Sequence, residues 1–137
     1  MPRKFSIIGA LFAALAVMTG AFGSHALKGR LDAYAIGIWE TAVLYHFIHA
    51  LGLLAIAALS SHASPRLANA SGWCLAIGVL LFSGSLYALA LFGSRGGLGF
   101  VTPIGGSAFI AGWLLFAVAL WRGRGRATWR RPGNRFR

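Results

Sequence analysis

The chain has 137 residues, of which 58% are hydrophobic and 11% charged, with 13 Lys and Arg against two acidic residues. A soluble domain carries about 25% charged residues, and a domain this small could not bury so much apolar surface, so the composition excludes a soluble globular fold. The basic residues lie at the ends of apolar segments rather than along one folded face, which excludes nucleic-acid binding and predicts an integral membrane protein.

Four apolar segments are long enough to cross a bilayer, which takes about 20 residues. They cover approximately residues 5–23, 38–60, 71–92 and 103–121. We therefore predict an all-α fold, a bundle of four transmembrane helices that forms one domain over residues 1–121. Residues 122–137 form an Arg-rich tail that we expect to be disordered and cytoplasmic.

The first segment follows Arg3 and Lys4 and precedes Ser24-His25-Ala26. A basic start and a small-residue end are also features of a cleaved signal peptide, which is the alternative interpretation. The apolar run is longer than the core of a usual signal peptide, so we favour a retained helix.

The connections between segments contain helix-capping residues. Asp32 is suited to cap a helix that starts before the second apolar segment, and Ser64-Pro65 separates the second segment from the third. Thr102 followed by Pro103 predicts an N-cap with proline in the first helical position. Small residues four positions apart, Gly84 with Ala88 and Ala108 with Gly112, predict close helix packing, and we expect the same of Gly105 and Gly106.

Orientation follows from the distribution of basic residues. Four spans place both termini on one side, which then carries Arg3, Lys4, Arg66 and the seven arginines of the tail. The other side carries Lys28, Arg30 and Arg95. The positive-inside rule therefore predicts that both termini are cytoplasmic. We expect the tail to lie against anionic lipid headgroups.

Polar side chains gather in the outer half of the predicted bundle, whereas the inner half is almost entirely apolar. At 1.5 Å per residue, His46 lies about 12 Å and His49 about 16 Å inside the outer boundary, and Ser83 falls at the depth of His46. We predict a polar pocket, open to the outer side, between the second and third helices. Its candidate residues are His25, Tyr45, His46, His49, Ser83, Tyr87 and Thr102.

The alternative is that these residues only form hydrogen bonds between helices and fix their packing, at about 0.6 kcal/mol per bond on average. Glu40 lies about 180° from His49 around the second helix. We expect Glu40 to form an interfacial ion pair with one of three basic residues, Lys28, Arg30 or Arg95.

Four blocks of sequence resemble the family known as domain of unknown function 423, small bacterial membrane proteins with eukaryotic transmembrane relatives. The blocks are GAFGSHALKGRL (20–31), WETAVLYHFIHAL (39–51), LFSGSLYALAL (81–91) and LGFVTPIGG (98–106). The resemblance implies four transmembrane helices, a retained first helix and a location in the bacterial plasma (inner) membrane. It brings no established activity and no assigned catalytic residues.

Two functions of different classes are compatible with these features. The shortage of carboxylates and the small-residue faces favour a non-enzymatic accessory or assembly subunit, bound to another membrane protein or to a second copy of itself. The alternative is a small transporter or channel that uses His46 or His49 in the outer pocket, because a histidine titrates near neutral pH.

A membrane enzyme or redox protein is a third and weaker interpretation. A haem between two histidines would need both at one depth, whereas His25 lies at the rim and His49 near the middle. A single cysteine, Cys74, excludes a multi-cysteine metal site. We predict no cofactor and no metal.

Overall fold

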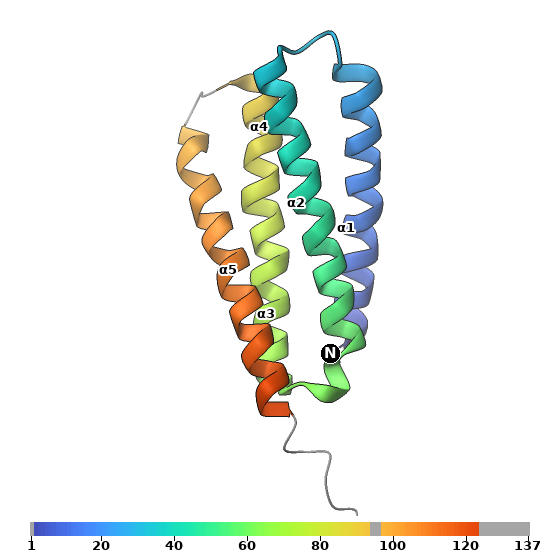
Figure 1. Ribbon diagram of the computed structural model, residues 1–137, viewed down its shortest axis with the longest axis vertical. Coiled ribbons are helices and arrows are strands. Elements are labelled where there is room, and N and C mark those ends of the chain that lie inside the picture. The colour runs from blue at the N-terminus through green and yellow to red at the C-terminus, as the bar shows by residue number, and fades with distance from the viewer. Residues whose placement is uncertain (1, 94–96, 124–137) are drawn as a thin grey trace, which may run out of the picture.

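The computed structural model describes residues 2–93 and 97–123 and is a bundle of four long helices (Figure 1). The first is α1 (Pro2–Phe22) with a π-helical turn, η1 (Gly23–Leu27), and the second is α2 (Ala33–Ala58). The third combines α3 (Pro65–Gly78), a second π-helical turn, η3 (Val79–Ser83), and α4 (Gly84–Phe92). The fourth is α5 (Leu98–Gly123), and a short 3-10 turn, η2 (Ser60–His62), precedes α3. Because the described residues contain no β-strand, the predicted all-α class is confirmed.

All four helices are long and apolar enough to cross a membrane, with 25 to 28 residues each. At 1.5 Å per residue these lengths are about 38 to 42 Å, which exceeds the roughly 30 Å of hydrocarbon. The helix ends therefore reach the headgroup regions. The side chains of α1 that face away from the bundle are apolar and exposed, as contact with lipid requires; they include Ile7, Leu11, Leu15, Val17 and Met18.

The helices begin earlier than hydropathy alone indicates, because the apolar segments mark the hydrocarbon region and not the helix ends. α2 begins at Ala33, and Asp32 Oδ1 accepts a hydrogen bond from the Ala35 backbone N–H at 2.8 Å, so the predicted cap at Asp32 is confirmed. Pro65 occupies the first turn of α3.

The predicted N-cap at Thr102 is wrong, because α5 already begins at Leu98 and Pro103 lies inside the helix. Pro103 is in the second turn, so its missing N–H removes only one intrahelical bond, the one to the Gly99 carbonyl. α5 also continues to Gly123, two residues into the predicted tail. The rest of that tail, residues 124–137, lies outside the described residues.

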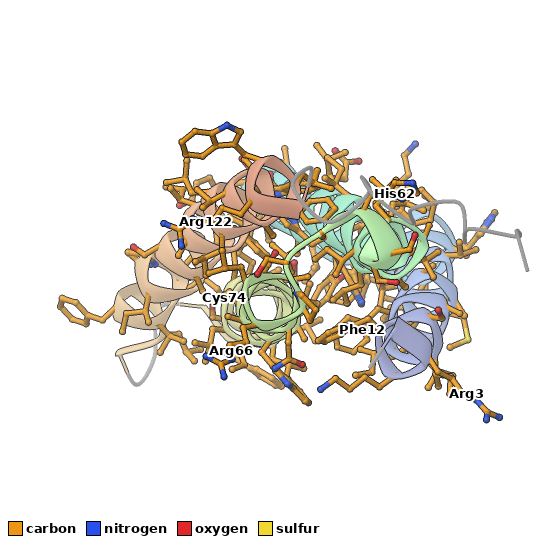
Figure 2. All side chains as sticks on the ribbon, turned by 90° about the horizontal axis from the view of Figure 1, so that it is seen from below. Arg3, Phe12, His62, Arg66, Cys74 and Arg122 are labelled. Carbon is orange, nitrogen blue, oxygen red and sulfur yellow. The ribbon has the colours of Figure 1, made fainter. Side chains whose placement is uncertain are left out.

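The two central helices are α2 and the α3–α4 helix, with α1 on one side and α5 on the other (Figures 1 and 2). α1 packs mainly on α2, and α5 packs mainly on α3. Their shared core contains large buried side chains from every helix: Phe5, Leu53, Ile56, Leu75, Phe109 and Phe116.

Glycines permit the closest helix contacts. A Cβ at Gly105 would overlap the backbone of Phe82, and one at Gly112 would overlap the Leu75 side chain. α5 therefore approaches the third helix at both positions, as predicted. The expectation for Gly84 was wrong, because a Cβ there would meet no atom within 4 Å.

The beginning of α1 at Pro2 and the end of α5 at Gly123 lie at the same end of the bundle as η2. The Ser64 backbone N–H donates to the Ala119 carbonyl at 2.8 Å, which ties the η2 connection to α5. Figure 2 looks onto this end, where Arg3, Arg66 and Arg122 lie around the bundle. Lys28 and Arg30 lie in the connection between η1 and α2, at the opposite end.

Candidate functional site

Three side chains form a hydrogen-bonded series, here called the polar relay, that joins α2, α4 and α1. His46 Nδ1 lies 3.1 Å from Tyr87 Oη, and Tyr87 Oη lies 3.0 Å from Thr19 Oγ1. Thr19 Oγ1 donates its single hydrogen to the Ala16 carbonyl at 3.1 Å. Tyr87 must therefore donate to Thr19, and His46 Nδ1 must donate to Tyr87. This assignment gives His46 a hydrogen on Nδ1 and leaves Nε2 as an acceptor.

The polar relay is enclosed by aromatic rings. His46 is only 6% exposed, and its ring meets the edge of Phe12 with 5.6 Å between centroids. Trp39 packs against Tyr87 at 4.6 Å and donates its indole N–H to the Thr19 carbonyl at 2.9 Å. His46 Nε2 is buried without a hydrogen-bond partner among the described residues. The relay thus joins three helices, with His46 buried and Tyr87 and Thr19 half-buried.

Serine and threonine hydroxyls make the other polar contacts between helices in this half. Ser83 Oγ donates to the Ala42 carbonyl of α2 at 2.9 Å. Ser85 Oγ donates to the Phe82 carbonyl at 2.9 Å and lies 2.6 Å from Thr102 Oγ1 of α5. Since the Ser85 hydrogen is already used, Thr102 donates to Ser85. Ser83 and Tyr87 therefore face α2, while Ser85 faces α5.

His49 occupies a different environment, about 60° around α2 from His46, where the helix faces α5. Its ring stacks on Phe109 with centroids 3.4 Å apart and planes 9° from parallel, and the residue is 4% exposed. His49 Nδ1 lies 2.6 Å from the Tyr45 carbonyl, which can only accept, so Nδ1 carries the hydrogen. The other ring nitrogen, Nε2, is an acceptor in the neutral imidazole.

The structure separates the seven candidate residues into three groups. His46, Ser83, Tyr87 and Thr102 are engaged in the interhelical hydrogen bonds described above. Tyr45 and His49 line a groove next to α5. His25 is exposed in η1 and joins neither group. At Ser83 the third helix contacts the α2 backbone directly, through the Ala42 carbonyl.

Two grooves of comparable size follow the outer surface of the bundle. The α2–α5 groove has a volume of about 600 Å³ and is lined by Tyr45, His49, Phe82, Pro103, Gly106, Ser107, Phe109, Ile110, Trp113 and Leu114. The α1–α2 groove has a volume of about 630 Å³ and is lined by Ala16, Val17, Gly20, Ala21, Gly23, Ser24, Lys28, Ile36, Trp39, Glu40, Val43, Leu44 and Phe47. Both include strongly exposed apolar side chains, such as Ile110 and Val17, so both open toward lipid.

Residues 19–106 match a family described as "Protein of unknown function (DUF423)". The match begins at Thr19 and contains the polar relay, Ser83 and the charged residues of the α1–α2 groove. The chain belongs to this family.

Named relatives of this DUF423 protein span nearly its whole length. The UPF0382 membrane protein of Staphylococcus haemolyticus is 48% identical over 120 residues, 88% of this chain and 97% of the relative. That of Staphylococcus epidermidis is 50% identical over 117 residues, 85% of this chain and 94% of the relative. The UPF0382 membrane protein YwdK of Bacillus subtilis is 44% identical over 118 residues, 85% of this chain and 95% of the relative. No solved structure is significantly similar. The protein is thus a bacterial-type membrane protein of an uncharacterised family.

Three residues of the site in the DUF423 protein are not among the seven predicted ones. Thr19 ends the polar relay, Trp39 covers it, and Phe109 stacks on His49. Thr19 had a visible signal, because it is a polar residue well inside the first apolar segment. Trp39 and Phe109 had none, because aromatic residues are common in any transmembrane helix. Within residues 2–93 and 97–123, no three His, Cys, Asp or Glu side chains gather to hold a metal ion.

Proposed function

We propose that this DUF423 protein is a non-enzymatic accessory or assembly subunit, which binds a transmembrane helix of a partner membrane protein in the α2–α5 groove. The observation that carries the proposal is the use of the polar groups. His46, Ser83 and Tyr87 form hydrogen bonds between helices of the bundle. The α2–α5 groove, in contrast, is open toward the lipid. A central transport pathway has less support, because Ser83 contacts the α2 backbone where such a pathway would run.

The chemistry of the α2–α5 groove suits a helix better than a lipid chain. Gly106 and Ser107 provide a shallow wall that permits a second backbone to approach closely. His49 lies in the middle of α2, roughly 24 Å along a helix of about 39 Å, and offers a free acceptor at Nε2. Acyl chains carry no hydrogen-bond donor at that depth, whereas a partner helix with a hydroxyl or amide side chain does.

Native mass spectrometry after purification in a mild detergent tests the proposal. We expect a discrete complex with another membrane protein at a fixed stoichiometry. A monomer under every mild condition would contradict the proposal. A mass twice that of the chain would show that the partner is a second copy of this chain. Transport in liposomes that is lost in His46→Ala and His49→Ala variants would favour the transporter alternative instead.

Filling the α2–α5 groove should abolish the complex. Gly106→Leu places a side chain in the groove, and the new Cβ makes only ordinary contacts with Phe82, at 3.7 and 3.8 Å. We expect at least a tenfold loss of partner recovery in native mass spectra, because one leucine blocks close helix approach. Gly84→Leu is the matched control, since a Cβ at Gly84 meets no atom within 4 Å. Equal recovery from both variants would show that the groove is not the docking site.

We further propose that both termini face the cytoplasm of a bacterial inner membrane, with the Arg tail on anionic headgroups. Ten basic residues belong to the terminal side and three to the other side, which supports this orientation. In a Cys74→Ala background, Arg30→Cys should react with an impermeant maleimide added to intact cells. Ser61→Cys, exposed in η2 at the opposite end, should react only after permeabilisation. The reverse labelling pattern would invert the proposed topology.

A further inference from the structure

The α1–α2 groove has charges of both signs at one end. Lys28 follows η1 and Glu40 lies in the second turn of α2, and both line this groove together with Ser24. Neither residue forms an ion pair within the described part of the chain, so the pairing that we expected between Glu40 and Lys28 or Arg30 is not formed. Arg95 lies outside the described residues. A carboxylate and an ammonium group thus face one concavity without neutralising each other.

The remainder of the groove is apolar and extends toward the middle of the membrane. Gly20 and Ala21 form a thin wall on the α1 side, while Val43 and Phe47 line the α2 side. Phe47 lies seven residues beyond Glu40, which corresponds to roughly 10 Å of depth along α2. The groove therefore has one positive and one negative side chain at headgroup level and an apolar lining below them.

We infer that the α1–α2 groove binds a single membrane lipid with a phosphoethanolamine headgroup. The phosphate would lie at Lys28, the primary ammonium at Glu40, and one acyl chain along Val43 and Phe47. The charge complementarity selects this occupant, because a purely anionic headgroup would leave Glu40 facing a second negative charge. An apolar partner helix in this groove would bury the charges of Lys28 and Glu40 without a polar partner, which costs free energy. The site is separate from the α2–α5 groove, since Glu40 and His49 lie on opposite sides of α2.

Nanodiscs with equal amounts of phosphatidylethanolamine and phosphatidylglycerol supply the test. Native mass spectrometry of the full chain released from these discs counts which lipid stays bound. We expect the wild type to retain phosphatidylethanolamine over phosphatidylglycerol by about fivefold. Glu40→Gln should bring this ratio close to one, because it removes only the partner of the ammonium group. Lys28→Gln should weaken the retention of both lipids, because both carry a phosphate.

Two controls separate a built site from ordinary lipid contact. Arg30→Gln removes a nearby exposed positive charge that does not line the groove, and it should leave the ratio unchanged. Ala21→Leu occludes the groove and should reduce lipid retention severalfold, whereas Ala10→Leu, at an exposed position of α1 outside it, should not. A wild-type ratio near one, or a Glu40→Gln ratio equal to that of the wild type, would overturn the inference. Lipid retention independent of all these changes would assign the bound lipid to the general annulus.

Discussion

Gly105→Val should destabilise the bundle by about 3 kcal/mol or more, because a Cβ at this position overlaps the Phe82 backbone. Backbone atoms cannot rotate aside as a side chain does, so α5 has to move away from the third helix. The displacement would also loosen the contact between Thr102 and Ser85, three residues before the glycine. Loss of helical signal during titration with a denaturing detergent measures the effect.

Gly84→Val is the control for this prediction, because it makes the same chemical change in the middle of a transmembrane helix. A Cβ at Gly84 meets open space, so we expect its stability to stay within about 0.5 kcal/mol of the wild type. Equal destabilisation by the two substitutions would mean that valine weakens the helix itself. In that case the close contact between α5 and Phe82 would not be needed for stability.

Tyr87→Phe should cost about 1–2 kcal/mol, although it removes only one oxygen atom. A hydrogen bond between membrane helices contributes about 0.6 kcal/mol on average, but this change also leaves the buried His46 Nδ1–H without its acceptor. An unsatisfied buried donor costs about 1–3 kcal/mol. Thermal unfolding in detergent measures the loss, and Tyr34→Phe, at a residue that is 78% exposed, is the control.

The polar relay also predicts that the stability effects of substitutions at Tyr87 and Thr19 are coupled. Thr19→Val removes the acceptor of the tyrosine hydroxyl, so its effect and that of Tyr87→Phe should not add in the double variant. We expect the double variant to lose less stability than the sum of the two single losses. Strict additivity would show that Tyr87 and Thr19 act independently and that no connected series joins the three helices.

The relative level of polar residues on neighbouring helices could be predicted to within about one helical turn, because it depends only on counting along each helix. His46 and Ser83 were expected at one level, and Ser83 contacts α2 at the Ala42 carbonyl, one turn from His46. The cap at Asp32 was likewise a local feature that the neighbouring residues define. Such features need no knowledge of which helices are neighbours.

The surroundings of the polar residues could not be predicted, because they depend on how the helices rotate about their axes. The π-helical turns η1 and η3 change the phase of the first and third helices, and no sequence pattern marked either turn. The rotation turns Ser83 and Tyr87 into helix contacts and leaves Gly84 in open space. The predicted start of the fourth helix failed for a simpler reason, since Thr102-Pro103 has the composition of a cap but α5 begins earlier.

Site-specific photo-crosslinking in living cells tests the proposed accessory role most directly. A photoreactive amino acid at Ile110, which is exposed and lines the α2–α5 groove, should give one discrete adduct with another membrane protein. The same amino acid at Ile77, exposed on α3 outside that groove, should give none, and Gly106→Leu should remove the Ile110 adduct. An adduct that survives Gly106→Leu, or the same result from both positions, would contradict docking of a partner helix in the α2–α5 groove.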